Sequence, residues 1–256
     1  MPELKKTKMP GLPRGFQVKY SEIFQRNIGL FSQEQQRRLE TASVTVVGPR
    51  SLCCVEALTL ARFGIKDIRI LIQPGDNMDG KAADLMGRLD LSLAQAVEET
   101  TPYTSAQEML LDPSNPETMH TFIQGSSIVL DLLPMKHLNM KTILAAQARA
   151  ASIFYISAHP LNMGCAMFIF HPEGIDPDIM FQKMSKALTG SLGHEQNAAT
   201  CFLKAGMAAT EAALILTGMR LKNELVLAPR FLVFNALERS FTIHDMSKDN
   251  SIGATT

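Results

Sequence analysis

The chain of 256 residues carries no net charge, because 25 Lys and Arg balance 25 Asp and Glu, and 46% of its residues are hydrophobic. This composition is typical of a globular protein that buries a sizeable core, and it excludes a disordered chain. The neutral balance gives no overall support to a nucleic-acid or anionic-membrane partner, so neither is expected. Four cysteines without a Cys-x-x-Cys pair exclude the usual zinc-ribbon spacing and a disulfide framework, and they favour a reducing cytoplasm.

The first 19 residues combine basic side chains with prolines, which is typical of a mobile arm. They contain no apolar core of signal-peptide length, and no apolar run in the chain approaches the ~18 residues of a membrane span. We therefore expect a soluble protein with a flexible basic arm at 1–19, one folded domain at 20–245 and a C-terminal tail at 246–256.

The first predicted elements form a strand, helix, strand unit. A short helix capped by Ser32 leads into a strand at 44–47. A helix at 51–63 then stops at Gly64, and a second strand follows at 68–72. Because the first strand lacks polar alternation, both of its faces are expected to be covered, so it should lie centrally and pair in parallel with the second.

Apolar runs and helix-compatible segments alternate over the next hundred residues. We predict helices at about 79–98, 114–124 and 137–150, and strands at 127–133, 152–157 and 165–170. Alternation of this kind predicts an α/β fold in which an open, mostly parallel, Rossmann-like sheet is flanked by helices.

The pattern changes after the segment "HPEGIDP". A helix at about 177–188 and a Gly-containing loop precede a long, largely apolar helix from Gln196 to Leu216. Few charges interrupt this helix, so we expect it to be buried on most sides, in a core or a subunit interface. Two late strands at 230–235 and 240–245 are predicted to form a hairpin.

Five segments, in this order, resemble the ThiF/MoeB/ubiquitin-activating superfamily, and within it bacterial ThiF-like proteins. They are "FQRNIGLFSQEQQRRLETASVTVVG", "LARFGIKDIRIL", "IVLDLLP", "GCAMFIFHPEGI" and "GMAATEAALILTG". The resemblance implies a two-fold dimer with a Rossmann-like sheet that binds ATP and Mg²⁺. It also implies adenylation of the C-terminal carboxylate of a ubiquitin-like protein, a sulfur carrier or a peptide.

The phosphate-binding turn of this family is only partly present. Gly48 matches the first glycine of the family's G-x-G-G-x-G turn, whereas the other glycine positions fall on Arg50, Ser51 and Cys53. Side chains at these places restrict the close backbone approach that a pyrophosphate needs. Arg50 could itself hold a phosphate, or it could fill the pocket.

The acidic residues that the resemblance implies are largely displaced. The Asp-x-Asp pattern after the second strand is lost, unless Asp76 has taken over its role. Asp131 is retained at the end of a predicted strand, but Pro134 and Met135 occupy the positions that include the metal-binding aspartate. Without that carboxylate Mg²⁺ has no obvious protein ligand, so no metal site and no catalytic residue are predicted.

Two further positions are candidates. Arg26, in "FQRNI", matches the family arginine that reaches the partner subunit's ATP phosphates, and the alternative is an ordinary surface salt bridge. His159 lies at a predicted strand-to-loop end, where ligands often bind in such sheets. No acid or nucleophile lies near it in sequence, and the cysteines are interpreted as packing residues.

Three functions remain open at this stage. The missing glycines and aspartates favour a pseudoenzyme that needs no cofactor, dimerises with itself or with an active ThiF-like relative, or presents a ubiquitin-like or peptide substrate. The alternative is an active adenylyltransferase with a rebuilt site, in which Arg50 and Asp76 serve ATP and Mg²⁺. The third is a Rossmann-type binder of another nucleotide or a flavin, held near Gly48 and His159.

Overall fold

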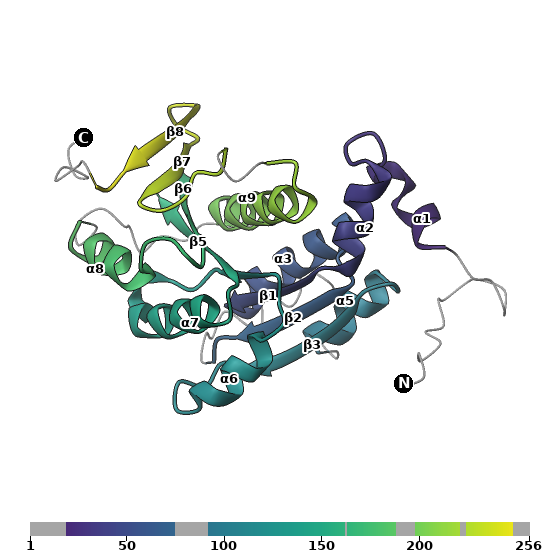
Figure 1. Cartoon of the computed structure of the whole chain (residues 1–256), viewed down its shortest axis with the longest axis horizontal. Helices are drawn as coiled ribbons and strands as arrows, with labels where there is room; N and C mark the ends of the chain where they lie inside the picture. Colours follow the sequence, from purple (N-terminus) through teal and green to yellow (C-terminus); the bar gives the residue numbers. More distant parts are fainter. Residues whose placement is uncertain (1–18, 75–91, 162, 188–197, 221–223, 248–256) are drawn as a thin grey trace.

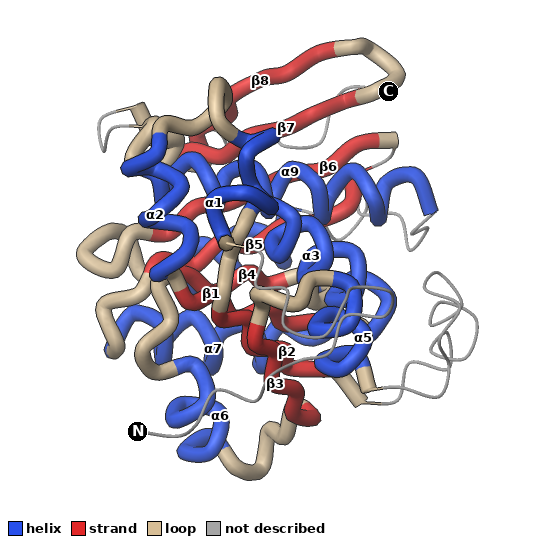
Figure 2. Tube along the Cα trace, turned by 90° about the vertical axis from the view of Figure 1, so that its right-hand side faces the viewer, coloured by secondary structure: helices blue, strands red, loops and turns tan. Residues whose placement is uncertain are grey.

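One mixed sheet of eight strands organises the molecule, with helices packed on both of its faces (Figures 1 and 2). A computed structural model describes residues 19–74, 92–161, 163–187, 198–220 and 224–247. The strands lie in the order β3-β2-β1-β4-β5-β6-β7-β8. The predicted Rossmann-like α/β class, with a mostly parallel sheet, a long C-terminal helix and a late hairpin, is confirmed.

Five strands form the parallel part of the sheet: β1 Ser43–Gly48, β2 Asp67–Ile72, β3 Ser105–Leu110, β4 Ile128–Asp131 and β5 Phe154–Leu161. β1 pairs in parallel with β2 on one side and with β4 on the other. Every residue of β1 is buried. The central position predicted for this strand is therefore confirmed, and so is its parallel pairing with β2.

The other three strands are antiparallel: β6 Gly164–Phe170, β7 Arg230–Asn235 and β8 Ser240–Asp245. β7 and β8 form the predicted hairpin with the predicted bounds, and Asn235 lies opposite Ser240 next to its turn. β8 ends the sheet on this side, and β3 ends it on the other.

The helices start and stop where local chemistry favours it. They are α1 Tyr20–Ile23, η1 Phe24–Asn27, α2 Gln33–Thr41, α3 Arg50–Phe63, α5 Leu93–Thr100, α6 Pro116–Ile123, η3 Met135–His137, α7 Leu138–Ala150, α8 Pro177–Ala187 and α9 Ala198–Thr217. Ser32 caps α2 by accepting a hydrogen bond from the backbone N–H of Gln35. Gly64 ends α3 with φ +104°, a left-handed conformation that favours glycine.

Two apolar cores lie on opposite faces of the sheet. One holds side chains of α2, α3, α5 and α9, with Leu60 and Ala209 fully buried. The other holds side chains of α6, α7 and α8, with Leu144 and Phe181 fully buried. The result is a three-layer α/β/α arrangement, as expected for a parallel sheet whose strands read as continuous apolar runs.

The sequence predicted some elements wrongly. β3 was missed, because this edge strand buries little and its polar residues Gln107 and Glu108 hide the apolar pattern. The single helix predicted at 79–98 lies mainly outside the described residues. Its described part starts at Leu93, because Ser92 is extended and caps α5. β5 runs past the predicted end to Leu161, because β6 continues to pair with it beyond Ser157, where its pairing with β4 stops. The prediction that His159 lies at a strand-to-loop end is therefore wrong, and this residue lies within β5.

The long helix α9 is part of the core. Its residues Thr200–Thr217 form an 18-residue window that is long and apolar enough to cross a membrane by length and composition, which the sequence analysis did not anticipate. Half of this window is buried in the fold, where α9 packs on α3, α2, β5 and β6. Buried Lys204 and Glu211 lie within it. We therefore interpret α9 as a core helix of this fold.

Candidate functional site

The strand order reverses between β1 and β4, because the chain crosses from β1 toward β2 and β3 on one side and from β4 toward β5 on the other. In open α/β sheets, ligands bind at the carboxyl ends of the strands at such a switch point. Gly48 and Asp131 are the last residues of the two strands that meet there. The switch point is therefore the candidate site.

Gly48 makes a close contact across this point. Its φ is +157°, and a Cβ on it would lie 3.0 Å from Cβ of Leu132. The N–H of Leu132 donates to the carbonyl of Val47, which holds the two strand ends together. A glycine is required here by close packing between the strands as well as by its backbone conformation.

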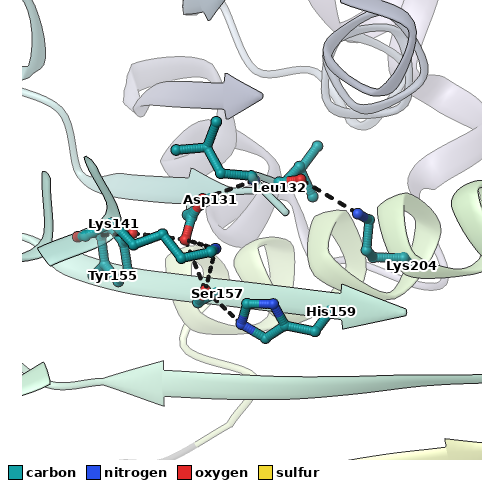
Figure 3. A network of polar contacts seen from close by, with 8 residues as sticks. Asp131, Leu132, Lys141, Tyr155, Ser157, His159 and Lys204 are labelled. Carbon is teal, nitrogen blue, oxygen red and sulfur yellow. Dashed lines mark hydrogen bonds and ion pairs between the residues drawn. The ribbon is translucent and has the colours of Figure 1, made fainter. Parts of the chain in front are cut away.

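Asp131 is the centre of a buried polar network (Figure 3). Its Oδ1 accepts the backbone N–H of Leu133 at 2.9 Å. Its Oδ2 accepts hydrogen bonds from the hydroxyls of Tyr155 and Ser157, both at 2.7 Å, and from the ammonium group of Lys141. Asp131, Lys141 and Ser157 are completely buried, so all of these bonds are shielded from water.

His159 joins the network through Ser157. Its Nε2 lies 3.0 Å from Oγ of Ser157, whose own proton goes to Asp131, so Nε2–H is the donor and Nδ1 carries the lone pair. Burial, together with the charges of Lys141 and Lys204, holds the pKa of His159 well below 6.5, so the ring is neutral. Nδ1 is buried without a hydrogen-bond partner among the described residues.

Lys204 approaches the same edge from α9, as Figure 3 shows. Its Nζ donates to the carbonyl of Leu132 at 3.3 Å, next to Asp131 in the chain. Burial lowers the pKa of Lys204 to about 8, and the nearby ammonium of Lys141 adds to the effect. The candidate site therefore contains an amine that titrates close to neutral pH.

Glu56 is a second buried ionisable residue, on α3, the helix that follows β1 at the switch point. Its side chain is fully buried, and neither carboxyl oxygen has a hydrogen-bond partner among the described residues. Burial raises the pKa of Glu56 well above 4.5, against the attraction of Lys204. The inner side of the site is thus polar, although apolar side chains surround it.

The lowered pKa of Lys204 predicts that the contribution of this residue to stability rises with pH. In the folded state this amine loses its proton near pH 8, whereas in the unfolded chain it keeps the proton up to about pH 10.5. We therefore expect the contribution of Lys204 to the free energy of unfolding to increase by roughly 2 kcal/mol between pH 8 and 10. The cysteine thiols, whose pKa values are raised by burial, act in the opposite direction over the same range, so the contribution of Lys204 is measured as a difference between two proteins.

Urea denaturation of the parent and of Lys204→Met, followed by circular dichroism at several pH values, measures this contribution. Between pH 8 and 10 the free energy of unfolding of the parent should gain roughly 2 kcal/mol relative to that of Lys204→Met. Lys141, whose pKa is also lowered by burial, contributes with the same sign in both proteins. Lys183→Met, at an exposed position on α8, is the matched control and should show the pH dependence of the parent. A pH dependence that Lys204→Met leaves unchanged would contradict the assignment.

The predicted phosphate-turn residues lie together at the start of α3. Arg50 opens the helix, and its guanidinium lies 4.0 Å from the carboxylate of Glu108 on β3. Ser51 follows on the first turn and is half-buried. The thiol of Cys53 is buried and donates to the carbonyl of Gly48 at 3.4 Å, and burial raises its pKa, so it is a packing residue rather than a reactive thiolate.

The structure brings together some of the predicted site residues. Asp131 and His159 meet through Ser157. Asp76 lies outside the described residues. Arg26 is exposed on η1, whose neighbouring Asn27 bonds the carbonyl of Phe63 at the C-terminal end of α3. Because α3 has 14 residues and a helix rises about 1.5 Å per residue, roughly 20 Å separate that end from the switch point.

Sequence reasoning missed four members of the network: Lys141, Tyr155, Ser157 and Lys204. Their contacts with Asp131 and Leu132 join residues far apart in the chain, which no local pattern reports. One signal was available in β5, where Tyr155, Ser157 and His159 alternate with apolar residues and so share one face of a buried strand.

A separate hollow of about 460 Å³ lies between β2, β3 and α6. Arg69 lines it, but its guanidinium is engaged by Asp67 and by the carbonyls of Phe122 and Gln124. The other lining residues include Thr118 and Thr121. No residue of the Asp131 network reaches this hollow, so it is not part of the candidate site.

Sequence comparison and structure comparison give different results. No protein-family model and no curated protein matches the sequence. By structure, the chain is similar to PaaA, with a TM-score of 0.69 and 14% identity over 92% of this chain and 77% of PaaA. It is also similar to E. coli MccB in complex with AMPCPP and MccA, with a TM-score of 0.65 and 15% identity over 90% of this chain and 73% of MccB. For E. coli MccB with ATP, the TM-score is 0.63 and the identity is 15% over 92% of this chain and 74% of MccB.

At this level of identity the similarity shows the fold. Each match extends over 92% of this chain. MccB is an adenylyltransferase of the ThiF/MoeB family, which is the superfamily that the five sequence segments resemble. The protein therefore has a ThiF-like α/β fold, of the kind seen in PaaA and MccB.

Proposed function

We propose that this protein is a ThiF-like pseudoenzyme, a cytoplasmic and non-catalytic subunit that has lost ATP-dependent adenylation. It acts by dimerisation and by binding a partner or a peptide. The proposal joins the fold, which is that of adenylyltransferases, to a switch point whose donor set does not fit ATP and Mg²⁺.

The observation that carries the proposal is the engagement of Asp131. Its two oxygens accept four hydrogen bonds, and one of the donors is the ammonium of Lys141. A divalent cation at this carboxylate would have to displace an internal cation or lie beside it, and either arrangement is unfavourable in a buried site. Pro134, at the metal-binding position that the resemblance implies, offers no oxygen from its side chain.

The phosphate turn supports the same proposal. Gly48 packs on Leu132, so the one retained glycine serves the strand contact. Arg50 is directed toward Glu108, whose carboxylate also accepts the N–H of Ala94 at 2.9 Å. In this arrangement the residues that replace the family glycines stabilise the fold around the turn.

One observation favours the alternative of an active adenylyltransferase. α3 begins directly after the switch point, and Pro49 at its N-cap supplies no capping side chain. The N–H groups of the first turn, with Arg50 beside them, are suited to a phosphate. ATP binding and ATP–pyrophosphate exchange distinguish the two functions.

We expect neither calorimetric ATP·Mg²⁺ binding nor ATP–pyrophosphate exchange from the purified protein with ubiquitin-like or peptide acceptors. Arg50→Ala should leave both readouts at the background level, as should Arg62→Ala, a control at the exposed other end of α3. Exchange that Arg50→Ala abolishes and Arg62→Ala retains would instead establish the active adenylyltransferase.

Arg26 is the proposed contribution to a partner. Its exposed position, roughly 20 Å from the molecule's own switch point, suits a residue that acts on the phosphates of an adjoining active subunit. In a complex with an active ThiF-like relative, Arg26→Ala should lower pyrophosphate exchange, whereas Arg37→Ala, at an exposed position of α2, should not. If both variants exchange as fast as the parent, Arg26 is an ordinary surface residue.

A peptide is the proposed ligand class. The similar structures of MccB include complexes with its peptide substrate MccA, and one of them holds N-formylated MccA. The proposed subunit would retain recognition of such an acceptor after losing the chemistry.

A further inference from the structure

β8 is an exposed edge of the sheet. Figures 1 and 2 show it at the periphery of the molecule, and within the described residues its extensive contacts are with β7 alone. Phe241 and Ile243 are each 55% exposed. The strand contains no Lys, no Pro and no bulge, which are the usual devices that stop an edge strand from pairing with another chain.

The exposed side chains continue a core face. Met167, Leu232 and Ile243 lie side by side across β6, β7 and β8, and they are 1%, 1% and 55% exposed. In the same way Phe241 lies opposite Phe234. α9 packs on this face over β5 and β6. The apolar cross-strand neighbours continue through β7 to β8, on which α9 does not pack extensively. The outer end of a buried sheet face is therefore solvent-exposed in the single chain.

We propose that a second copy of this chain pairs with β8, antiparallel and about a two-fold axis through Thr242, so that one sheet runs through both copies. In a symmetric antiparallel pair the axis passes through one residue, and residues at equal distances on either side of it face each other on the same side of the sheet. The register can therefore be tested residue by residue.

An axis through Thr242 gives matched partners. Phe241 lies opposite Ile243 of the partner subunit, and Thr242 lies opposite Thr242 of the partner subunit. Ser240 lies opposite His244 of the partner subunit. Aromatic with β-branched and threonine with threonine are cross-strand pairs that stabilise sheets.

The neighbouring registers are less favourable. An axis through Ile243 places Phe241 opposite Asp245 of the partner subunit, twice because of the symmetry. An axis through Phe241 pairs only residues 240–242, and it leaves Ile243 without a strand partner because Arg239 lies in the turn with a left-handed backbone, φ +52°. The sequence of β8 is thus self-complementary in one register, which favours a second copy as the occupant of this edge.

This inference rests on the dimerisation in the proposed function and assigns it to β8, and it holds whether or not the switch point binds ATP. It also specifies a surface, whereas the sequence resemblance implied a dimer without one.

The test is cysteine cross-linking at two positions of the same strand. Thr242→Cys places the two new thiols on directly opposed residues, whose Cα atoms lie ~4.5 to 5.5 Å apart, within disulfide range. Ser240→Cys is the matched control, because its two copies are four residues apart along the strands, about 14 Å and beyond that range. With diamide at tens of micromolar protein, we expect Thr242→Cys to form a covalent dimer at least tenfold faster.

The parent protein under the same conditions measures any contribution of its own four cysteines, of which three are buried. Equal rates for the two variants, or no cross-link in a protein that sedimentation shows to be dimeric, would overturn the proposal, and the second result would place the dimer contact elsewhere. Such failures leave the pyrophosphate-exchange experiment unaffected.

Sedimentation of the unmodified chain gives an independent readout. Ile243→Lys sets a charge opposite Phe241 of the partner subunit, and we expect it to weaken dimerisation at least tenfold. Leu237→Lys, at the hairpin turn and 72% exposed, lies outside the paired segment and should leave the dimer intact. A parent protein that stays monomeric at ~100 µM would contradict the proposal.

Discussion

Replacing Asp131 by Asn is expected to lower the free energy of unfolding by about 4 kcal/mol, which is within the range for breaking a buried ion pair. The substitution removes the negative charge from a carboxylate that accepts four hydrogen bonds. It leaves the ammonium of Lys141 completely buried without its counter-charge. The new amide group also brings two N–H donors to a place already filled with donors.

Urea denaturation of the single and double variants measures the effect and assigns it. Asp131→Asn combined with Lys141→Met removes both charges, so it should recover part of the loss. Asp112→Asn is the control, because Asp112 is exposed and its carboxylate accepts hydrogen bonds from Ser114 alone among the described residues. An Asp131→Asn protein as stable as the parent would show that the network does not hold the strand ends together.

Gly48→Ala should be similarly destabilising, by about 4 kcal/mol, because backbone strain and overpacking each cost 1 to 3 kcal/mol. The added methyl would lie 3.0 Å from Cβ and 3.3 Å from the backbone carbonyl carbon of Leu132. The backbone cannot move away freely, since Leu132 is hydrogen-bonded to Val47 and the carbonyl of Gly48 accepts the N–H of Gln73. The φ of +157° adds strain for any residue with a side chain.

Gly206→Ala provides a control with the opposite sign. Gly206 lies within α9, and a Cβ on it would meet no atom within 4 Å outside the backbone of its own helix. Alanine is favoured over glycine in a helix, so this variant should gain about 0.5 to 1 kcal/mol. Denaturation midpoints of the two variants compare them directly. A loss at Gly206 equal to that at Gly48 would indicate a general effect of the substitution.

The sequence predicted the elements whose chemistry is local. β1, α3 and β2 were found because an uninterrupted strand, a helix with Gly64 after it and a second apolar run need no distant contact to be recognised. The β7–β8 hairpin was found for the same reason. β3 was missed because an edge strand is stabilised by its pairing with β2, which the sequence does not display.

The candidate site was predictable only in part. Gly48 and Asp131 were singled out because they match positions of the family pattern, and both end strands at the binding edge of the sheet. His159 was singled out because it was predicted at a strand end, whereas it lies within β5. Their common network depends on Lys141 and Ser157, which reach Asp131 from another helix and another strand. A lysine in an amphipathic helix is ordinarily a solvent-exposed residue, and only the packing of α7 against β5 makes it a buried counter-ion.

Because the hydroxyl of Tyr155 is buried, the ultraviolet absorbance of tyrosine can be used to follow unfolding. The chain has no Trp and three Tyr, so tyrosine dominates its aromatic spectrum. Burial raises the pKa of Tyr155 well above 10.0, burial raises that of Tyr20 to about 12, and the pKa of Tyr103 is raised as well. Just above pH 10 the native protein therefore absorbs as neutral phenol, and tyrosinate emerges as the chain unfolds. The absorbance change in alkali is consequently a label-free report of unfolding, to which Tyr155 in the interior around Asp131 contributes.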